Sequence, residues 1–310
     1  MIDSLLAITP LFILISLGYI ARRTLLDVHM LPAFNQFVYY FAVPALLFNA
    51  ARGQSLQNLF YFPGLLAFIL GILLTLAVSL SVSRYLFGCQ QAEGLILRGL
   101  NSVFANYAYM GIPLTFGLLG EASHAPSISI ILAANVLLIG GAQLLLEMQS
   151  HRGTSVRQVW RILDHSLLRS SIFLSTVVGL AVSGWHIPIP HVLDSTLNML
   201  APAAIPVALF CLGASLEFRT TNTRLTELAW LIGVKLLLHP ALTCLAFKLL
   251  HVQDPAWLMS SVLLTALPTG ALVHVVAMRY NIFEKASSQM VVFSTLLSLV
   301  SVSIWGSLLS

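Results

Sequence analysis

The sequence predicts an all-α integral membrane protein with ten transmembrane helices arranged as two inverted repeats of five. Three observations carry this prediction: the composition, the spacing of long apolar stretches, and a likeness between the two halves of the chain. Of the 310 residues, 58% are hydrophobic and only 8% are charged, and the mean hydropathy is +0.92. A soluble domain carries roughly a quarter charged residues, so the composition indicates a membrane environment.

Ten apolar stretches are long enough to cross a bilayer, because a hydrocarbon core of ~30 Å needs about 20 helical residues. Arg22 and Arg23 follow the first stretch, whereas a cleavable signal peptide carries its positive charge first, so we expect a retained helix. The predicted spans cover residues 5–21, 31–50, 62–83, 95–119, 126–147, 167–184, 193–216, 228–250, 257–278 and 287–309.

Basic residues are concentrated in alternate loops, above all in the linker 150–166 between the fifth and sixth spans. The positive-inside rule then places this linker in the cytoplasm and both termini outside. Since each half, 1–149 and 167–310, has five helices, the second half enters the membrane in the opposite orientation.

The two halves also share short motifs in the same order. The run Ala42–Phe48 in the second span is similar to Ala204–Phe210 in the seventh. At nearly the same spacing, Gly18 of the first span corresponds to Gly179 of the sixth. These matches support an internal repeat.

Two spans contain helix-breaking sequences, Gly111-Ile112-Pro113 in the fourth and Pro268-Thr269-Gly270 in the ninth. Proline removes a backbone donor and opposes the preceding turn. Within a bilayer, broken helices persist only where protein or a water-filled cavity satisfies the freed groups, and paired breaks indicate a transporter's binding site. The positive ends of the half-helices would favour an anion there. We therefore predict that these two spans are broken crossover helices.

Polar side chains near the first break are candidates for the substrate site. Asn106 opens the first break, and its amide is expected to contact ligand or to cap freed backbone groups. Tyr107 and Tyr109 would shape a cavity or merely pack.

The second break is preceded by a polar stripe. Ser261, Thr265 and Thr269 follow each other at four-residue intervals, and their hydroxyls would line a cavity or, equally, bind neighbouring helices. His274, beyond the break, is a weaker candidate.

Lys235 lies inside the eighth span, where a lysine costs about 2.5–3.5 kcal/mol on insertion scales. It would act as a counter-charge for the substrate, or as a fixed cation where an ion-coupled relative binds sodium; alternatively, it extends to the cytoplasmic end of its helix. His239, one turn later, would relay protons or be a hydrogen-bonded interior histidine.

The sequence lacks the residues that ion-binding carboxylate sites, metal sites and common enzyme motifs require. No Asp or Glu lies in the middle of a predicted span, and the three cysteines form no metal-binding spacing. No metalloprotease or nucleotide-binding motif is present. We therefore expect no enzyme activity, no cofactor, no metal site and no nucleic-acid partner.

Several motifs together resemble the auxin efflux carrier family, over essentially the whole chain. They are Asn106-x3-Met110-Gly111-Ile112-Pro113, the run Asn35–Phe48, Lys235-x4-Pro240-Ala241-Leu242, and Ala266-Leu267-Pro268 followed by Ala277-x2-Tyr280. This family includes plant PIN carriers and bacterial malate-permease-like proteins, and it belongs to the bile acid transporter fold group.

The resemblance implies a transport domain, made of helices 3–5 and 8–10 with the crossover helices 4 and 9, that moves against scaffold helices 1, 2, 6 and 7. It also implies organic anions as substrates. The chain departs from the family pattern at Tyr107-Ala108 and at Ala271-Leu272, so auxin itself is not inferred.

These observations predict a secondary active transporter of small organic anions that works by alternating access, of elevator type. Asn106, the half-helix ends at Gly111–Pro113 and Pro268–Gly270, and Lys235 would hold the carboxylate. The alternatives are a sodium- or proton-coupled symporter or antiporter of related fold, and a non-transporting membrane sensor. The expected setting is a bacterial inner membrane, with membrane lipid as a partner. A homodimer through the scaffold helices is compatible with this arrangement.

Overall fold

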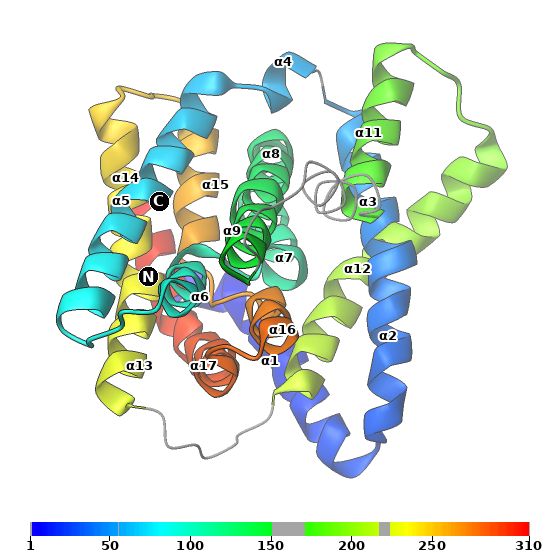
Figure 1. The fold of residues 1–310 in the computed structure, drawn as a ribbon. Coiled ribbons are helices and arrows are strands. Elements are labelled where there is room, and N and C mark those ends of the chain that lie inside the picture. Colours follow the sequence, from blue (N-terminus) through cyan, green and yellow to red (C-terminus); the bar gives the residue numbers. More distant parts are fainter. Residues whose placement is uncertain (1, 55, 151–170, 217–223, 310) are drawn as a thin grey trace.

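The computed structural model describes residues 2–54, 56–150, 171–216 and 224–309, and these residues form helices and no β-strand (Figure 1). The predicted linker, apart from its first residue, lies outside the described residues. The α-helices are α1 (Ile2–Thr24), α2 (Leu31–Phe37), α3 (Val43–Arg52), α4 (Leu56–Leu59), α5 (Phe62–Tyr85), α6 (Ala92–Val103), α7 (Ile112–Leu119), α8 (His124–Ala134), α9 (Gly141–Ser150), α11 (Ser171–Gly184), α12 (His191–Ser215), α13 (Leu225–Gly233), α14 (His239–Leu249), α15 (Pro255–Thr265), α16 (Ala271–Tyr280) and α17 (Glu284–Leu309). The π-helical turns are η2 (Val38–Ala42), η3 (Tyr107–Gly111), η5 (Asn135–Gly140) and η7 (Val234–Leu238), and the 3-10 turns are η1 (Val28–Met30) and η4 (Gly120–Ser123).

Six helical stretches in the described part of the chain are long and apolar enough to cross a membrane. They are Leu31–Arg52, Gln57–Tyr85, Tyr109–Gln149, His191–Ser215, Leu225–Leu249 and Glu284–Leu309. Three shorter apolar helices are Ser171–Gly184, Pro255–Thr265 and Ala271–Tyr280. An all-helical structure with six candidate membrane spans is therefore confirmed for the described residues, while the total of ten spans stays a prediction.

Three of the π-helical turns come shortly before a proline. η2, η3 and η7 are followed, after one further residue, by Pro44, Pro113 and Pro240. In each case the residue before the proline donates its N–H to the carbonyl five residues earlier, as Ile112 does to Tyr107. Proline has no N–H and its ring opposes the carbonyl four residues back, so a wider turn re-spaces the carbonyls ahead of it. The helix therefore continues through these prolines.

Of the predicted break from Asn106 to Pro113, the part at Gly111–Pro113 is consequently wrong, while Asn106 does lie in the break. Gly111, Ile112 and Pro113 are helical, with Pro113 in the first turn of α7, where its missing donor is tolerated. The chain leaves the helix earlier, at Phe104, whose ψ of 114° is extended. The second break lies where the sequence places it, between α15 and α16.

The helices fall into two groups that are visible in Figure 1. α1 packs along α12, α11 packs along α3, and α12 also contacts α3, with α2, α3, α11 and α12 on the right of the view. On the left, α5 packs against α14, and α14 against α15. α7, α8, α9 and α16 lie between these groups in the view, and α6 and α17 lie below α15.

Glycines allow the closest helix crossings of the first group. A Cβ added at Gly18 of α1 would overlap the Phe210 carbonyl of α12. A Cβ at Gly179 of α11 would lie 2.8 Å from the Phe48 carbonyl of α3. The sequence matches pair Gly18 with Gly179 and Phe48 with Phe210, and each crossing joins a glycine of one half to the phenylalanine of the other.

Candidate functional site

Two non-helical segments, Phe104–Asn106 and Ala266–Gly270, interrupt their helices and pair with each other. The Asn106 N–H donates to the Pro268 carbonyl at 2.8 Å, and the Gly270 N–H donates to the Phe104 carbonyl at 3.1 Å. Ala105 and Thr269 thereby form an isolated antiparallel bridge. A buried backbone group without a partner is costly, and here each break satisfies groups that the other leaves free.

Thr269 anchors the second break to two neighbouring helices. Its hydroxyl donates to the Asn101 carbonyl of α6 at 2.9 Å, and its N–H donates to the Ser294 hydroxyl of α17 at 3.0 Å. Thr269 is fully buried. Its role in this geometry is to hold the backbone of the break.

Two carbonyls at the point where α15 ends and the second break begins also have side-chain partners. The Lys235 ammonium donates to the Thr265 carbonyl at 2.6 Å, and the Ser301 hydroxyl donates to the Ala266 carbonyl at 2.8 Å. A cation at a helix C-terminus is favoured by the helix dipole. Lys235 therefore caps α15 and does not extend to the surface, since it is 0% exposed.

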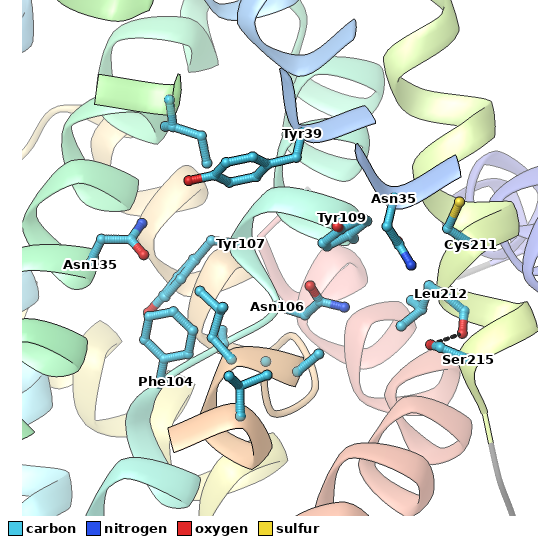
Figure 2. A pocket seen from close by; sticks show the side chains of 16 residues that line it. Asn35, Tyr39, Phe104, Asn106, Tyr107, Tyr109, Asn135, Cys211, Leu212 and Ser215 are labelled. Carbon is cyan, nitrogen blue, oxygen red and sulfur yellow. Dashed lines mark hydrogen bonds between the residues drawn. The ribbon is translucent and has the colours of Figure 1, made fainter. Parts of the chain in front are cut away.

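A cavity of about 260 Å³ opens beside the paired breaks (Figure 2). It takes its walls from both breaks and from α2, η2, η3, η5, α11, α12 and α16. Its lining residues are Asn35, Tyr39, Phe104, Ala105, Asn106, Tyr107, Tyr109, Asn135, Ile172, Cys211, Leu212, Ser215, Gly270, Ala271, Leu272 and Val275.

Asn106 presents an unused amide to this cavity. Its side-chain nitrogen is buried and has no hydrogen-bond partner, and Figure 2 draws the side chain among Tyr109, Asn35 and Leu212. The Tyr107 hydroxyl is likewise buried without a partner, and its ring lies edge-on to Phe104 with centroids 5.3 Å apart. Burying an unpaired donor costs about 1–3 kcal/mol, so a ligand that accepts from these groups would bind favourably.

Among the described residues, the lining of the cavity carries no charge: none of them is Lys, Arg, His, Asp or Glu, and the polar groups are amides, hydroxyls and a thiol. A single carboxylate can be held by neutral donors, as oxyanions commonly are in proteins. A second charge would need further donors or a cation.

Four of the eleven predicted site residues line the cavity: Asn106, Tyr107, Tyr109 and Gly270. Gly111 and Pro113 lie in the helix beyond the first break, and a Cβ at Gly111 would meet the Leu264 side chain at 2.8 Å. The others that lie away from the cavity are Lys235, Thr265, Pro268, Thr269 and His274.

Asn35, Tyr39, Asn135 and Ser215 also line the cavity, although the sequence did not single them out as site residues. The Asn135 side-chain nitrogen donates to the Ile131 carbonyl, one turn earlier in the chain, at 2.8 Å. Asn135 is a single amide in an apolar stretch, whereas Asn35 is followed by Gln36 and Tyr39 by Tyr40. Such local patterns do not say which stretches meet.

No group of three His, Cys, Asp or Glu side chains within the described ranges is arranged to hold a metal ion.

Comparison with known proteins identifies the family. The family model described as "Membrane transport protein" matches residues 3–306. A putative malonate transporter of Rhizobium meliloti (strain 1021) is 29% identical over 298 residues, which cover 95% of this chain and 92% of the relative. The Uncharacterized transporter YfdV of Escherichia coli (strain K12) is 24% identical, with 96% and 94% covered.

The plant relatives match over a shorter part. Auxin efflux carrier component 3a of Oryza sativa subsp. japonica is 26% identical over 147 residues, covering 46% of this chain and 23% of the plant protein. The resemblance to auxin efflux carriers is thus confirmed, and these relatives are transporters rather than enzymes. With a match over nearly all of its length, the chain belongs to the membrane transport protein family that includes the auxin efflux carriers.

Proposed function

We propose that this protein is a secondary active transporter of small organic anions and that the cavity beside the paired breaks is its substrate site. The observation that carries the proposal is the buried, unpartnered amide of Asn106 on the cavity wall. The family membership and the relative named as a putative malonate transporter support an organic anion as cargo. The neutral lining favours an anion that enters with one negative charge.

We further propose alternating access of the elevator type. The group containing α1, α3, α11 and α12 would be the scaffold, and the helices that carry the two breaks would move against it. The exchanged crossings, Gly18 on Phe210 and Gly179 on Phe48, support an inverted repeat. So do the two bonds between the breaks, because Asn106 to Pro268 and Gly270 to Phe104 are also exchanged contacts. We also propose ten membrane spans with both termini outside the cytoplasm. Reporter enzymes fused at either terminus would test the location of the termini.

The decisive experiment is uptake by purified protein in liposomes. The panel includes propionate, malonate and malonate monomethyl ester. We expect Asn106→Ala to raise KM for the transported anion about 10- to 100-fold, because a hydrogen bond to a charged group is worth ~1.5–3 kcal/mol. Asn106→Asp, nearly the same shape, places a negative charge against the substrate and is expected to abolish uptake.

Asn49→Ala is the matched control. Asn49 also lies in an apolar helix, but it donates to the Asn198 side chain at 3.0 Å and is not part of the cavity wall. This variant should keep the wild-type KM. Wild-type kinetics in Asn106→Ala, or no flux of any anion by the wild type, would refute the proposed site or the proposed function respectively.

A further inference from the structure

Lys235 and His239 form a buried basic pair behind the second break. They are one turn apart, at η7 and the start of α14, and both are 0% exposed. Residues four apart lie on the same helix face, so the two side chains are neighbours. Lys235 has one hydrogen-bond partner, the Thr265 carbonyl, and neither ring nitrogen of His239 has any.

No acidic side chain in the described ranges compensates this pair. The two ion pairs found there are Arg52–Asp194 and Arg98–Glu227, and neither involves Lys235 or His239. The remaining charged side chains on helices that pack against the pair lie in first or last turns: Arg84, Glu93, Lys248, Glu284 and Lys285. α15 carries no charged or titratable residue. A buried charge without an opposite partner is costly, so a permanently charged ammonium and imidazolium are disfavoured here.

The pair is physically connected to the substrate cavity. The carbonyl that accepts from Lys235 belongs to the last residue of α15, and the second break starts at the next residue. That break bonds to the backbone of Asn106 through Pro268. α15 packs against α14, and the Ser261 hydroxyl of α15 is buried without a hydrogen-bond partner. A change of charge on Lys235 or His239 alters the strength of the hydrogen bond from Lys235 to the Thr265 carbonyl, which holds the start of the second break.

We propose that Lys235 and His239 are the proton-carrying site of the transporter, and that one proton crosses the membrane together with each organic anion. This inference rests on the proposed function. A proton leaves water on the side where the anion enters, adds to a nitrogen of the pair, and returns to water on the other side. No other bond forms or breaks. Because the pair is buried in this structure, exchange with water belongs to other conformations of the cycle.

Electrostatics favours this coupling. Moving one charge across a membrane potential costs about 2.3 kcal/mol per 100 mV, and an accompanying proton removes that cost for a monoanion. A sodium ion would need a shell of oxygen ligands and no cation beside it, whereas this region presents a basic amine and an imidazole. The basic pair can carry positive charge as a proton.

The test measures anion flux and internal pH together in liposomes that contain a pH-sensitive dye. For the wild type we expect one proton per anion and accumulation driven by a pH gradient. We expect His239→Gln and Lys235→Met to lose gradient-driven accumulation at least tenfold. Both should keep anion–anion exchange at equal pH, which moves no net proton. A merely structural defect would reduce exchange as well.

His124→Gln is the control. His124 is a partly buried histidine at the start of α8, and it belongs neither to this pair nor to the cavity lining. It should retain wild-type coupling. If Lys235→Met does not fold, His239→Gln decides the question by itself. Anion flux without proton flux in the wild type, or unchanged coupling in His239→Gln, overturns the coupling and leaves the proposed function intact. Absence of all anion flux overturns both.

Discussion

Buried hydroxyls in this protein mostly serve backbone groups of the interrupted helices. The Thr265 hydroxyl donates within its own helix to the Ser261 carbonyl at 2.9 Å, and the Thr269 hydroxyl reaches α6. Both residues are 0% exposed and lie away from the cavity. Of the two interpretations that the polar stripe allowed, contact between helices is therefore the one that fits Thr269.

Thr269→Val tests this interpretation. Valine keeps the shape but leaves the buried Asn101 carbonyl without its partner, which should lower the free energy of unfolding by about 1–3 kcal/mol. Thr295→Val is the control, because the Thr295 hydroxyl donates to Val291 within its own helix. Denaturation by sodium dodecyl sulfate would measure both variants. Equal losses in the two would contradict a bridging role for Thr269.

At the scale of elements, helix interruptions and close helix crossings arise from different causes. A π-helical turn precedes each of Pro44, Pro113 and Pro240, and at each of them the helix continues through the proline. The actual breaks occur where two backbone segments bond to each other. α1 and α12 meet at glycines, since a Cβ at Gly213 would overlap the Ile15 carbonyl. Small residues let membrane helices approach this closely.

Gly213→Ala is expected to force α1 and α12 apart. Overpacking of a tight contact costs ~1–3 kcal/mol, so the melting temperature of the purified protein should fall. Gly117→Ala makes the same change in α7, where an added Cβ meets nothing within 4 Å, and it should leave the melting temperature unchanged or slightly raised. If the melting temperature fell as much in Gly117→Ala as in Gly213→Ala, the close crossing of α1 and α12 would not be the cause of the fall.

At the scale of the whole molecule, an ion pair joins the two halves of the chain away from the cavity. Arg98 of α6 donates to the Glu227 carboxylate of α13 at 2.5 Å, with side chains 16% and 9% exposed. Arg98 also lies over the Phe283 ring, 4.3 Å from its centroid. Removing one partner of such a pair leaves the other charge buried and uncompensated.

A double-mutant cycle on this pair should show strong coupling. Arg98→Met and Glu227→Met are each expected to lower the free energy of unfolding by about 3–5 kcal/mol, and the double variant by clearly less than their sum. The pair Arg52–Asp194 offers the comparison, because its side chains are 25% and 35% exposed and its coupling should be only ~0.2–1 kcal/mol. Additive losses at Arg98 and Glu227 would contradict a coupled ion pair.

The sequence alone determined the class of protein, the apolar stretches and the position of the second break. These depend on local properties: hydropathy over about 20 residues, and a proline whose missing N–H acts on its own turn. Asn106 could be singled out for the same reason, as an amide beside a helix-opposing motif.

Tertiary structure decided what local patterns do not encode. α6 ends at Val103 and the break follows there rather than at Gly111–Pro113, because Phe104 and Asn106 find backbone partners in the second break. Lys235 caps α15 instead of lining the cavity, and Asn35, Asn135 and Ser215 come together from separate helices. Each of these outcomes is a contact between residues far apart in the chain, and its energy depends on the arrangement of the whole bundle.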